Sequence, residues 1–145
     1  WAPPPKLIRQ MPYRADGAAY LEIGYSQIFV LPADGSTPRQ LTSGPYNHGN
    51  TPEWMPDGSA LVFSANRHED WQYDPLNSEI YKVSLADGAI TALTSRPGPD
   101  EGPAVSLDGR QVAYVGFDDR LQGYQVRNLY LMNADGSGQR SLSRP

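Results

Sequence analysis

Short apolar runs separated by turn residues follow one another along most of this chain. The segments 61–63 (Leu-Val-Phe) and 112–115 (Val-Ala-Tyr-Val) are typical, because each is apolar throughout and Gly or Asp stands close by. Runs of this length predict β-strands that are buried on both faces. Apolar residues never recur at helical spacing for more than about two turns. The pattern therefore predicts an all-β fold built from short strands.

Two kinds of strand–turn–strand unit alternate along the chain, and each kind contains an Asp-Gly pair. The aspartates of the first kind are Asp16, Asp57 and Asp108, and those of the second kind are Asp34, Asp87 and Asp135. Asp-Gly between apolar runs is a strong hairpin signal, because Gly accepts the positive φ of the turn. One unit of each kind makes four strands in roughly 40–50 residues, the size of a propeller blade. We therefore expect all six pairs to be structural turns.

The repeat predicts a β-propeller of about three four-stranded antiparallel blades. The predicted blade units cover about residues 8–42, 50–94 and 102–143. Natural propellers usually have four to eight blades, so we expect a partial propeller that belongs to a larger protein. Two other outcomes stay open. The chain could associate with copies of itself to complete a ring, or it could form an open arc with exposed blade faces.

Composition narrows the classes of partner and chemistry. The chain has 12 Lys and Arg against 16 Asp and Glu, so neither a nucleic acid nor a membrane surface is an expected partner. It has no Cys, which excludes disulfides, thiolate zinc sites and a cysteine nucleophile. No apolar run approaches the ~18 residues of a membrane span, and no signal peptide is visible. The compartment stays open between periplasmic or secreted and cytoplasmic.

Longer motifs resemble known propellers. The segment 54–64 (Trp-Met-Pro-Asp-Gly-Ser-Ala-Leu-Val-Phe-Ser), followed by Glu79-Ile-Tyr and Leu93-Thr, resembles the TolB-like, WD-repeat-like blade motif. Four further segments resemble the propeller domain of bacterial prolyl-oligopeptidase-family serine peptidases: 38–44, 64–71, 96–100 and 114–120, which ends at Arg120. The acylaminoacyl-peptidase-like and dipeptidyl-aminopeptidase-like branch of that family fits best.

The resemblance implies a parent hydrolase in which the propeller precedes an α/β-hydrolase domain with a Ser-Asp-His triad. This chain has no Gly-x-Ser-x-Gly elbow, and both His48 and His68 lie in predicted loops without an evident nucleophile partner. We therefore expect no catalytic centre and no cofactor in the chain itself. The expected role in proteolysis is to gate the access of a peptide substrate and to dock the adjacent α/β-hydrolase domain. The alternative is a non-enzymatic, TolB-like protein-binding propeller.

Binding residues are expected on the face opposite the Asp-Gly turns. That face collects the loops between the second and third strands and the loops between blades. Long loops on a rigid scaffold are where binding residues concentrate. The candidates for binding a peptide substrate or a partner domain are Arg67, Glu69, Asp70, Trp71, Tyr73, Asp74, Asp118, Asp119, Arg120 and Tyr124.

A structural explanation of the same residues stays open, in which the charges form local ion pairs and the tyrosines pack on blade edges. A metal site is not expected, because His48, His68 and the nearby carboxylates lack recognisable ligand spacing.

Overall fold

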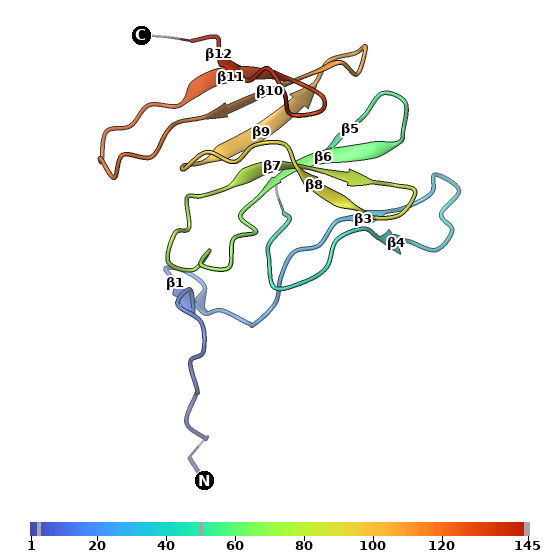
Figure 1. The fold of residues 1–145 in the computed structure, drawn as a ribbon. Helices are drawn as coiled ribbons and strands as arrows, with labels where there is room; N and C mark the ends of the chain where they lie inside the picture. Colours follow the sequence, from blue (N-terminus) through green and yellow to red (C-terminus); the bar gives the residue numbers. More distant parts are fainter. Residues whose placement is uncertain (3, 50, 144–145) are drawn as a thin grey trace.

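Two four-stranded antiparallel sheets form the body of the molecule (Figure 1). The computed structural model describes residues 1–2, 4–49 and 51–143, and the regular elements among these are all β-strands. The first sheet contains, in order, β5 (Glu53–Trp54), β6 (Ala60–Ala65), β7 (Glu79–Ser84) and β8 (Ile90–Ala92). The second contains β9 (Asp100–Val105), β10 (Gln111–Gly116), β11 (Asn128–Asn133) and β12 (Arg140–Ser141). Consecutive strands are neighbours, as in a propeller blade, so the predicted all-β partial propeller is confirmed.

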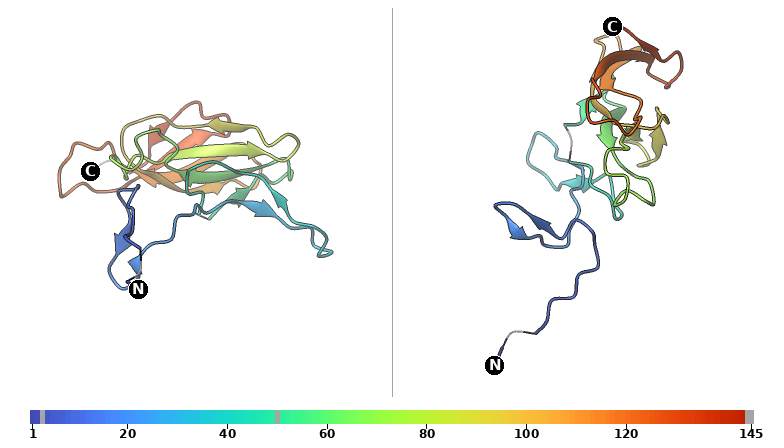
Figure 2. Two further views of the ribbon diagram at one scale, coloured as in Figure 1. Left: turned by 90° about the horizontal axis from the view of Figure 1, so that it is seen from below. Right: turned by 90° about the vertical axis from the view of Figure 1, so that its left-hand side faces the viewer.

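The N-terminal unit differs from the other two. Its hairpins form separate two-stranded sheets, β1 (Arg14–Ala15) with β2 (Ala19–Tyr20) and β3 (Phe29–Val30) with β4 (Arg39–Gln40). Every residue of β1 and β2 is exposed, and this hairpin stands away from the body (Figure 2). An isolated two-stranded hairpin is marginally stable. The blade boundaries stay predictions, and residue 50 lies outside the described residues.

Five of the Asp-Gly turns are closed by the side chain of their own aspartate. Asp57 Oδ1 accepts the Ser59 N–H at 2.9 Å, and Gly58 has a φ of 70°. The hydrogen bonds from the Ser59 side chain and N–H hold the pKa of Asp57 below its usual range. The same backbone contact, two residues onward, closes the turns at Asp34, Asp87, Asp108 and Asp135. These turns are therefore structural, as predicted.

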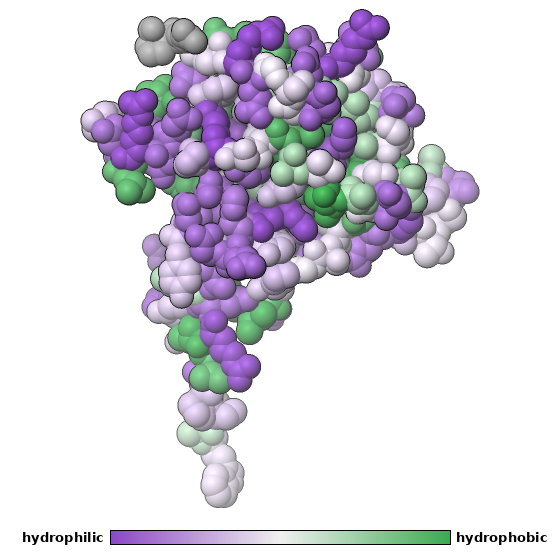
Figure 3. Space-filling view, viewed as in Figure 1, coloured by the Kyte–Doolittle hydropathy of each residue, from purple (hydrophilic) through white to green (hydrophobic). Residues whose placement is uncertain are grey.

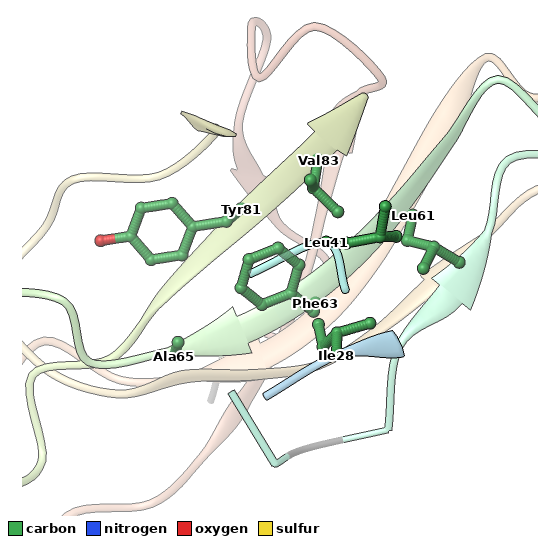
Figure 4. Close-up of a cluster of buried hydrophobic side chains, with 7 residues drawn as sticks. All are labelled: Ile28, Leu41, Leu61, Phe63, Ala65, Tyr81 and Val83. Carbon is green, nitrogen blue, oxygen red and sulfur yellow. The ribbon is translucent and has the colours of Figure 1, made fainter. Parts of the chain in front are cut away.

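The first blade junction is the contact between the β3–β4 pair and one face of the β5–β8 sheet. Figure 4 shows side chains from both partners gathered around the ring of Phe63. That ring stacks on Tyr81 with centroids 5.7 Å apart. The buried cluster consists of Ile28, Leu41, Leu61, Phe63, Ala65, Tyr81 and Val83. Burial of this apolar surface is the main force that holds the junction together.

The second blade junction lies between the other face of the β5–β8 sheet and the β9–β12 sheet. Successive residues of a strand point to opposite faces, so β6 contributes Leu61 and Phe63 to the first junction and Val62 to the second. This explains why all of β6 is buried and why its sequence lacks alternation. The buried cluster consists of Val62, Ile80, Leu93, Val112, Tyr114 and Met132.

A hydroxyl contact recurs at the third strand of each unit. In the first unit the Ile28 N–H donates to Thr42 Oγ1 at 2.8 Å, and that hydroxyl donates to Gln27 Oε1 at 2.9 Å. The N–H to hydroxyl contact recurs in the pairs Ile80–Thr94 and Leu129–Ser143. These contacts establish which residues are equivalent from unit to unit. Gln27, Glu79 and Asn128 therefore occupy one repeated position, immediately before these three N–H donors.

The outer face of the last sheet is less covered than its equivalents. Ile80 and Leu93 are 0% and 5% exposed in the second junction. Their counterparts Leu129 and Leu142 are 41% and 50% exposed. Apolar residues at these repeated positions are therefore buried wherever a further sheet follows and exposed on the last sheet.

The hairpin turns and the long loops occupy opposite ends of the sheets, as predicted. In Figure 1 the hairpin turns of the two four-stranded sheets lie to the right, and the loops 66–78 and 117–127 lie to the left. Hydrophilic residues dominate the face shown in Figure 3, while the N-terminal segment below the body exposes Leu7 and Ile8. The described residues contain no helix with the length and apolar character needed to span a membrane.

Candidate functional site on the long-loop face

The two long loops are connected by the linker 95–99, which joins β8 to β9. The Gly98 N–H donates to Asn77 Oδ1 at 3.2 Å, and Pro97 O accepts the Asp119 N–H at 3.0 Å. Gly98 has a φ of 116°, and a Cβ there would collide with the backbone of Phe117. Glycine is therefore needed where the linker passes against the 117–127 loop. The linker makes the two loops parts of one surface.

Contacts within the 66–78 loop fold it onto itself. Asn66 Nδ2 donates to Asp74 O at 2.7 Å, which ties the two sides of the loop together. Asp70 O accepts the N–H groups of Tyr73 and Asp74 at 2.7 and 3.1 Å. Trp71 packs edge-on against Tyr25, with ring centroids 6.1 Å apart, and so anchors the loop to the preceding unit.

An arginine of this loop closes the first junction. The Arg67 guanidinium contacts His48 Nε2 and lies over the rings of Tyr46 and Tyr81, 5.1 and 5.7 Å from their centroids. His48 is buried against Phe63. Burial, followed by the charge of Arg67, lowers the pKa of His48, so its imidazole stays neutral at neutral pH. The first junction thus buries a neutral imidazole beside a stacked cation.

A different arginine closes the second junction. Arg96 Nε donates to Asp100 Oδ1 at 2.9 Å, and Nη1 pairs with Asp118 Oδ1 at 3.1 Å. The guanidinium lies 3.8 Å from the ring centroid of Tyr130. Although burial acts in the opposite direction, the hydrogen bonds and charge of Asp100 raise the pKa of Arg96. Arg96 is therefore a permanent cation held against a wholly buried carboxylate.

Two backbone features fix the position of Asp100. Its carbonyl accepts the hydroxyls of Ser64 and Ser78 at 2.6 and 3.2 Å. A Cβ at Gly116 would collide with Pro99 O and with the Arg96–Asp100 pair. Complete burial raises the pKa of Asp100, while Arg96 acts in the opposite direction. Among the described residues, Asp100 Oδ2 has no hydrogen-bond partner.

A second buried carboxylate lies beside this pair. Glu79 is 2% exposed, and its Oε2 accepts the hydroxyl of Thr94. Its Oε1 lies 3.7 Å from His68 Nε2. Burial, with a further contribution from the Asp100 charge, raises the pKa of Glu79 to about 7, although the Thr94 hydroxyl and Arg96 oppose the shift. Glu79 is therefore a buried acid whose charge changes near neutral pH.

The structure separates the predicted site residues into two groups. Five of them make contacts that shape the loops: Arg67, Trp71, Asp74, Asp118 and Asp119. Five others present their side chains to solvent: Glu69, Asp70, Tyr73, Arg120 and Tyr124. The binding role of all ten stays a prediction. Of the local ion pairs that the structural explanation expects, Asp118 forms one with Arg96, and the side chains of the second group are exposed to solvent.

Within the described residues, the candidate side chains are divided among separate pockets. Asp118, Arg120 and Tyr124 line a pocket of about 210 Å³ in the 117–127 loop. Trp71 lines another of about 380 Å³, together with Glu101 of β9. Among residues 1–2, 4–49 and 51–143, no group of three or more His, Asp or Glu side chains is arranged to hold a metal ion. The arrangement suits contact over a surface better than enclosure of a small molecule.

Sequence reasoning missed the buried polar residues beneath this face. Arg96 and Asp100 were noted only within the segment 96–100 that resembles the peptidase propeller, and Glu79 only as part of a blade motif. The repeat contained a usable signal. Glu79 occupies the position of Gln27 and Asn128, so a carboxylate replaces a neutral amide at a buried position. A charge at such a position requires a partner.

Comparisons with known proteins agree with the architecture. The family model described as the dipeptidyl peptidase IV (DPP IV) N-terminal region matches residues 16–115. An uncharacterised protein of Agrobacterium fabrum is 34% identical over 129 residues, which cover 84% of this chain and 39% of that protein. The Tol-Pal system protein TolB of Francisella tularensis is 26% identical over 125 residues, which cover 84% of this chain and 24% of that protein.

The crystal structure of TolB from Acinetobacter baumannii shares the fold. It superposes with a TM-score of 0.64 at 16% sequence identity, covering 86% of this chain and 28% of that one. The chain therefore spans from about a quarter to two fifths of the length of the relatives described here.

Proposed function

The chain belongs to the family of the dipeptidyl peptidase IV N-terminal region, and on this premise we propose that it is the propeller part of a larger serine peptidase. In this role the long-loop face docks a catalytic α/β-hydrolase domain and controls the access of a peptide substrate to it. The family match over residues 16–115 is the observation that carries the proposal.

The geometry of the loop face supports a docking role. Arg67 and Arg96 are engaged beneath the surface, by His48 and by Asp100, and they hold the loop bases rigid. Exposed side chains such as Tyr73 and Tyr124 stand above this base. A recognition surface needs adaptable outer contacts on a well-supported scaffold, and tyrosine supplies apolar area with a polar tip.

The uncovered outer face supports a larger propeller. Leu129 and Leu142 occupy positions that are buried at both blade junctions, yet here they are about half exposed. Ala113 and Val115 of β10 alternate with the buried Val112 and Tyr114, so they point to the same outer face. In the proposed parent protein, a further blade covers this face.

A TolB-like interaction propeller is the second candidate. The observation that favours it is the 26% identity to the Tol-Pal system protein TolB over 125 residues. In that role the same loop face binds a protein partner and no catalytic domain is attached.

A fluorophosphonate probe distinguishes the two functions when it is applied to the full-length product of the gene that encodes this chain. The probe labels the activated serine of a serine hydrolase covalently. We expect stoichiometric labelling of one serine outside residues 1–145 and none within them. A full-length product without any labelled serine would overturn the peptidase proposal.

The gating role is tested in the same full-length protein. The double substitution Tyr73→Ala and Tyr124→Ala should change the ratio of casein to dipeptide hydrolysis by about fivefold or more, because both side chains stand at the proposed entrance. Leu107→Ala is the control, since Leu107 is an even more exposed apolar side chain but lies in a hairpin turn at the opposite end. An unchanged ratio in the double variant would contradict gating by this face.

A further inference from the structure

The tetrapeptide Ala-Asp-Gly-Ala occurs twice in this chain, at 15–18 and at 86–89. Both copies lie in hairpin turns, the first between β1 and β2 and the second between β7 and β8. An aspartate side chain reacts most readily with the next backbone nitrogen when glycine follows it, because glycine has no Cβ to hinder the approach. The two copies are identical in sequence, so a difference in this reaction between them reports on the fold.

Both reacting groups are engaged in the second copy. Asp87 Oδ1 accepts the Ala89 N–H at 3.1 Å, and the Gly88 N–H donates to Ser84 O at 2.9 Å. The carboxyl cannot turn toward the Gly88 nitrogen without losing its own hydrogen bond, and that nitrogen cannot react without losing the other. Hydrogen bonds from the Ser84 side chain and the Ala89 N–H also lower the pKa of Asp87, which favours the ionised and less reactive carboxylate.

The same two contacts recur at the other four closed turns. In each of them the glycine N–H donates to the backbone carbonyl three residues earlier, at 2.8 or 2.9 Å, and the preceding aspartate accepts the N–H two residues onward. These turns contain Asp34–Gly35, Asp57–Gly58, Asp108–Gly109 and Asp135–Gly136.

The first copy of the tetrapeptide is bonded differently. The Ala18 N–H, the counterpart of the Ala89 N–H, donates to Ala15 O at 3.1 Å instead of to the aspartate. Within the described part of the chain, no hydrogen bond engages the Asp16 carboxyl or the Gly17 N–H. All four residues of this copy are exposed to solvent. The two reacting groups are therefore both available here.

The hairpin that contains Asp16 is also easily opened. Its strands β1 and β2 have two residues each, and it stands away from the body (Figure 2). Ala19 has a φ of 56°, a left-handed conformation that is strained for alanine. A short, strained hairpin without a neighbouring strand is marginally stable. Its opening gives the chain the freedom to bring the Asp16 carboxyl onto the Gly17 nitrogen.

We propose that Asp16–Gly17 is the site at which this protein forms isoaspartate. The Gly17 nitrogen bonds to Cγ of the protonated Asp16 carboxyl, and the carboxyl hydroxyl leaves with the proton of that nitrogen as water, which closes a succinimide ring. A water molecule then reopens the ring. Addition at the α-carbonyl carbon of Asp16 gives isoaspartate, which is joined to Gly17 through its side-chain carbonyl, and addition at Cγ restores aspartate. Isoaspartate lengthens the backbone of the turn by one carbon.

Peptide mapping of the aged protein tests this proposal. The 145-residue chain is incubated at physiological temperature and pH, and isoaspartate is located by mass spectrometry with electron-transfer fragmentation. Isoaspartate should accumulate at Asp16 about tenfold or more faster than at Asp87, because two hydrogen bonds need not be broken first. Equal rates in the two copies of the tetrapeptide would overturn the proposal.

The same incubation in urea separates the effect of the fold from that of the sequence. Unfolding removes the contacts of Asp87 and Gly88, so the two copies should then react at similar rates. A difference that persists in urea would contradict the proposal, because the sequence around each copy would then be its cause.

Asp16→Glu is the matched variant, since glutamate closes a larger ring far more slowly. Total isoaspartate, measured as methyl incorporation by an isoaspartyl carboxyl methyltransferase, should fall to the small amount from the five closed turns. An unchanged total would show that the reaction occurs elsewhere. These measurements require neither a peptidase nor a partner, so their outcome is independent of the labelling experiment.

Discussion

The two blade junctions share a backbone arrangement and differ in charge. At each junction a threonine hydroxyl accepts the N–H of the third strand, at Ile28 in one case and at Ile80 in the other. At each junction an arginine also lies over the tyrosine of the next sheet, Tyr81 or Tyr130. Both junctions therefore share this backbone contact and an arginine stacked on a tyrosine ring.

The polar groups beneath these arginines are different. The first junction contains the half-buried amide of Gln27 and the buried imidazole of His48, which burial keeps neutral. The second junction buries the carboxyl of Glu79, at the position equivalent to Gln27, and the carboxyl of Asp100. Burial of a charge is costly unless it is paired, so the second junction depends on Arg96 in a way that the first does not depend on Arg67. A repeated fold thus contains one junction that is insensitive to charge and one that is sensitive to it.

Replacing each arginine in turn should give the largest difference in stability between the two junctions. Arg96→Ala leaves the buried Asp100 carboxylate unpaired and should reduce the free energy of unfolding by about 3–5 kcal/mol. Arg67→Ala loses stacking on two rings beside a neutral histidine and should cost about 1–2 kcal/mol. Urea denaturation at neutral pH measures both. Adding Asp100→Asn to Arg96→Ala should restore part of the loss, and equal losses for the two arginine variants would contradict the comparison.

A glycine distinguishes the second junction sterically. Gly116 is the last residue of β10, where the equivalent residue of β6 is Ala65. Gly116→Ala would push a Cβ into Pro99 O and the Arg96–Asp100 pair, and it should cost about 2–3 kcal/mol.

Gly123→Ala is the control for that substitution. A Cβ at Gly123 meets no atom within 4 Å, so the change in unfolding free energy should be within about 0.5 kcal/mol of zero. Thermal unfolding of the two variants side by side makes the comparison. A Gly116→Ala protein as stable as the control would show that the packing at this junction is not tight.

The pH dependence of stability gives a smaller effect. The pKa of Glu79 is raised to about 7 in the folded protein, so the folded state binds this proton more tightly than the unfolded state does. The stabilisation from this group is therefore present at low pH and is lost as the pH rises toward and through about 7. Glu79→Gln should remove about 1–2 kcal/mol of this dependence and should be the more stable protein at pH of about 8.

Asp100 contributes in the same direction, because burial also raises its pKa. The variant should therefore show a reduced slope rather than none. Unfolding free energies measured from acid to alkaline pH test the sign, and a stability of the wild type that rises with pH across this range would contradict the assignment of Glu79.

The regular blades were predictable because their signals are local. The apolar runs 61–63 and 112–115 lie within the strands β6 and β10, and five of the Asp-Gly pairs form turns that their own carboxylates close. A hairpin is specified by a few adjacent residues, so its sequence suffices to predict it. The N-terminal unit has the same turn residues at Asp16 and Gly17, yet its two hairpins form separate two-stranded sheets, so the local signal predicted the hairpins and not how they pair.

The candidate loop residues show the limit of this approach. Their position at one end of the sheets followed from strand order, and the structure places them there. The role of each individual residue could not be predicted from strand order. Arg67 contacts His48 in the linker before β5, and Asp118 pairs with Arg96 in the linker before β9. Which charged side chains meet depends on how the blades stack, and no single segment of the sequence specifies that stacking.

The sequence by itself determined the strand order, the turn positions and the division into a turn end and a loop end, because each follows from local backbone preference and the period of the repeat. Only the tertiary structure decided that Glu79 and Asp100 are buried side by side with Arg96 as the neighbouring cation. These residues come from β7, β9 and the linker between them, and they meet because the apolar faces of two sheets are driven together. The cost of burying their charges then selects the pairing.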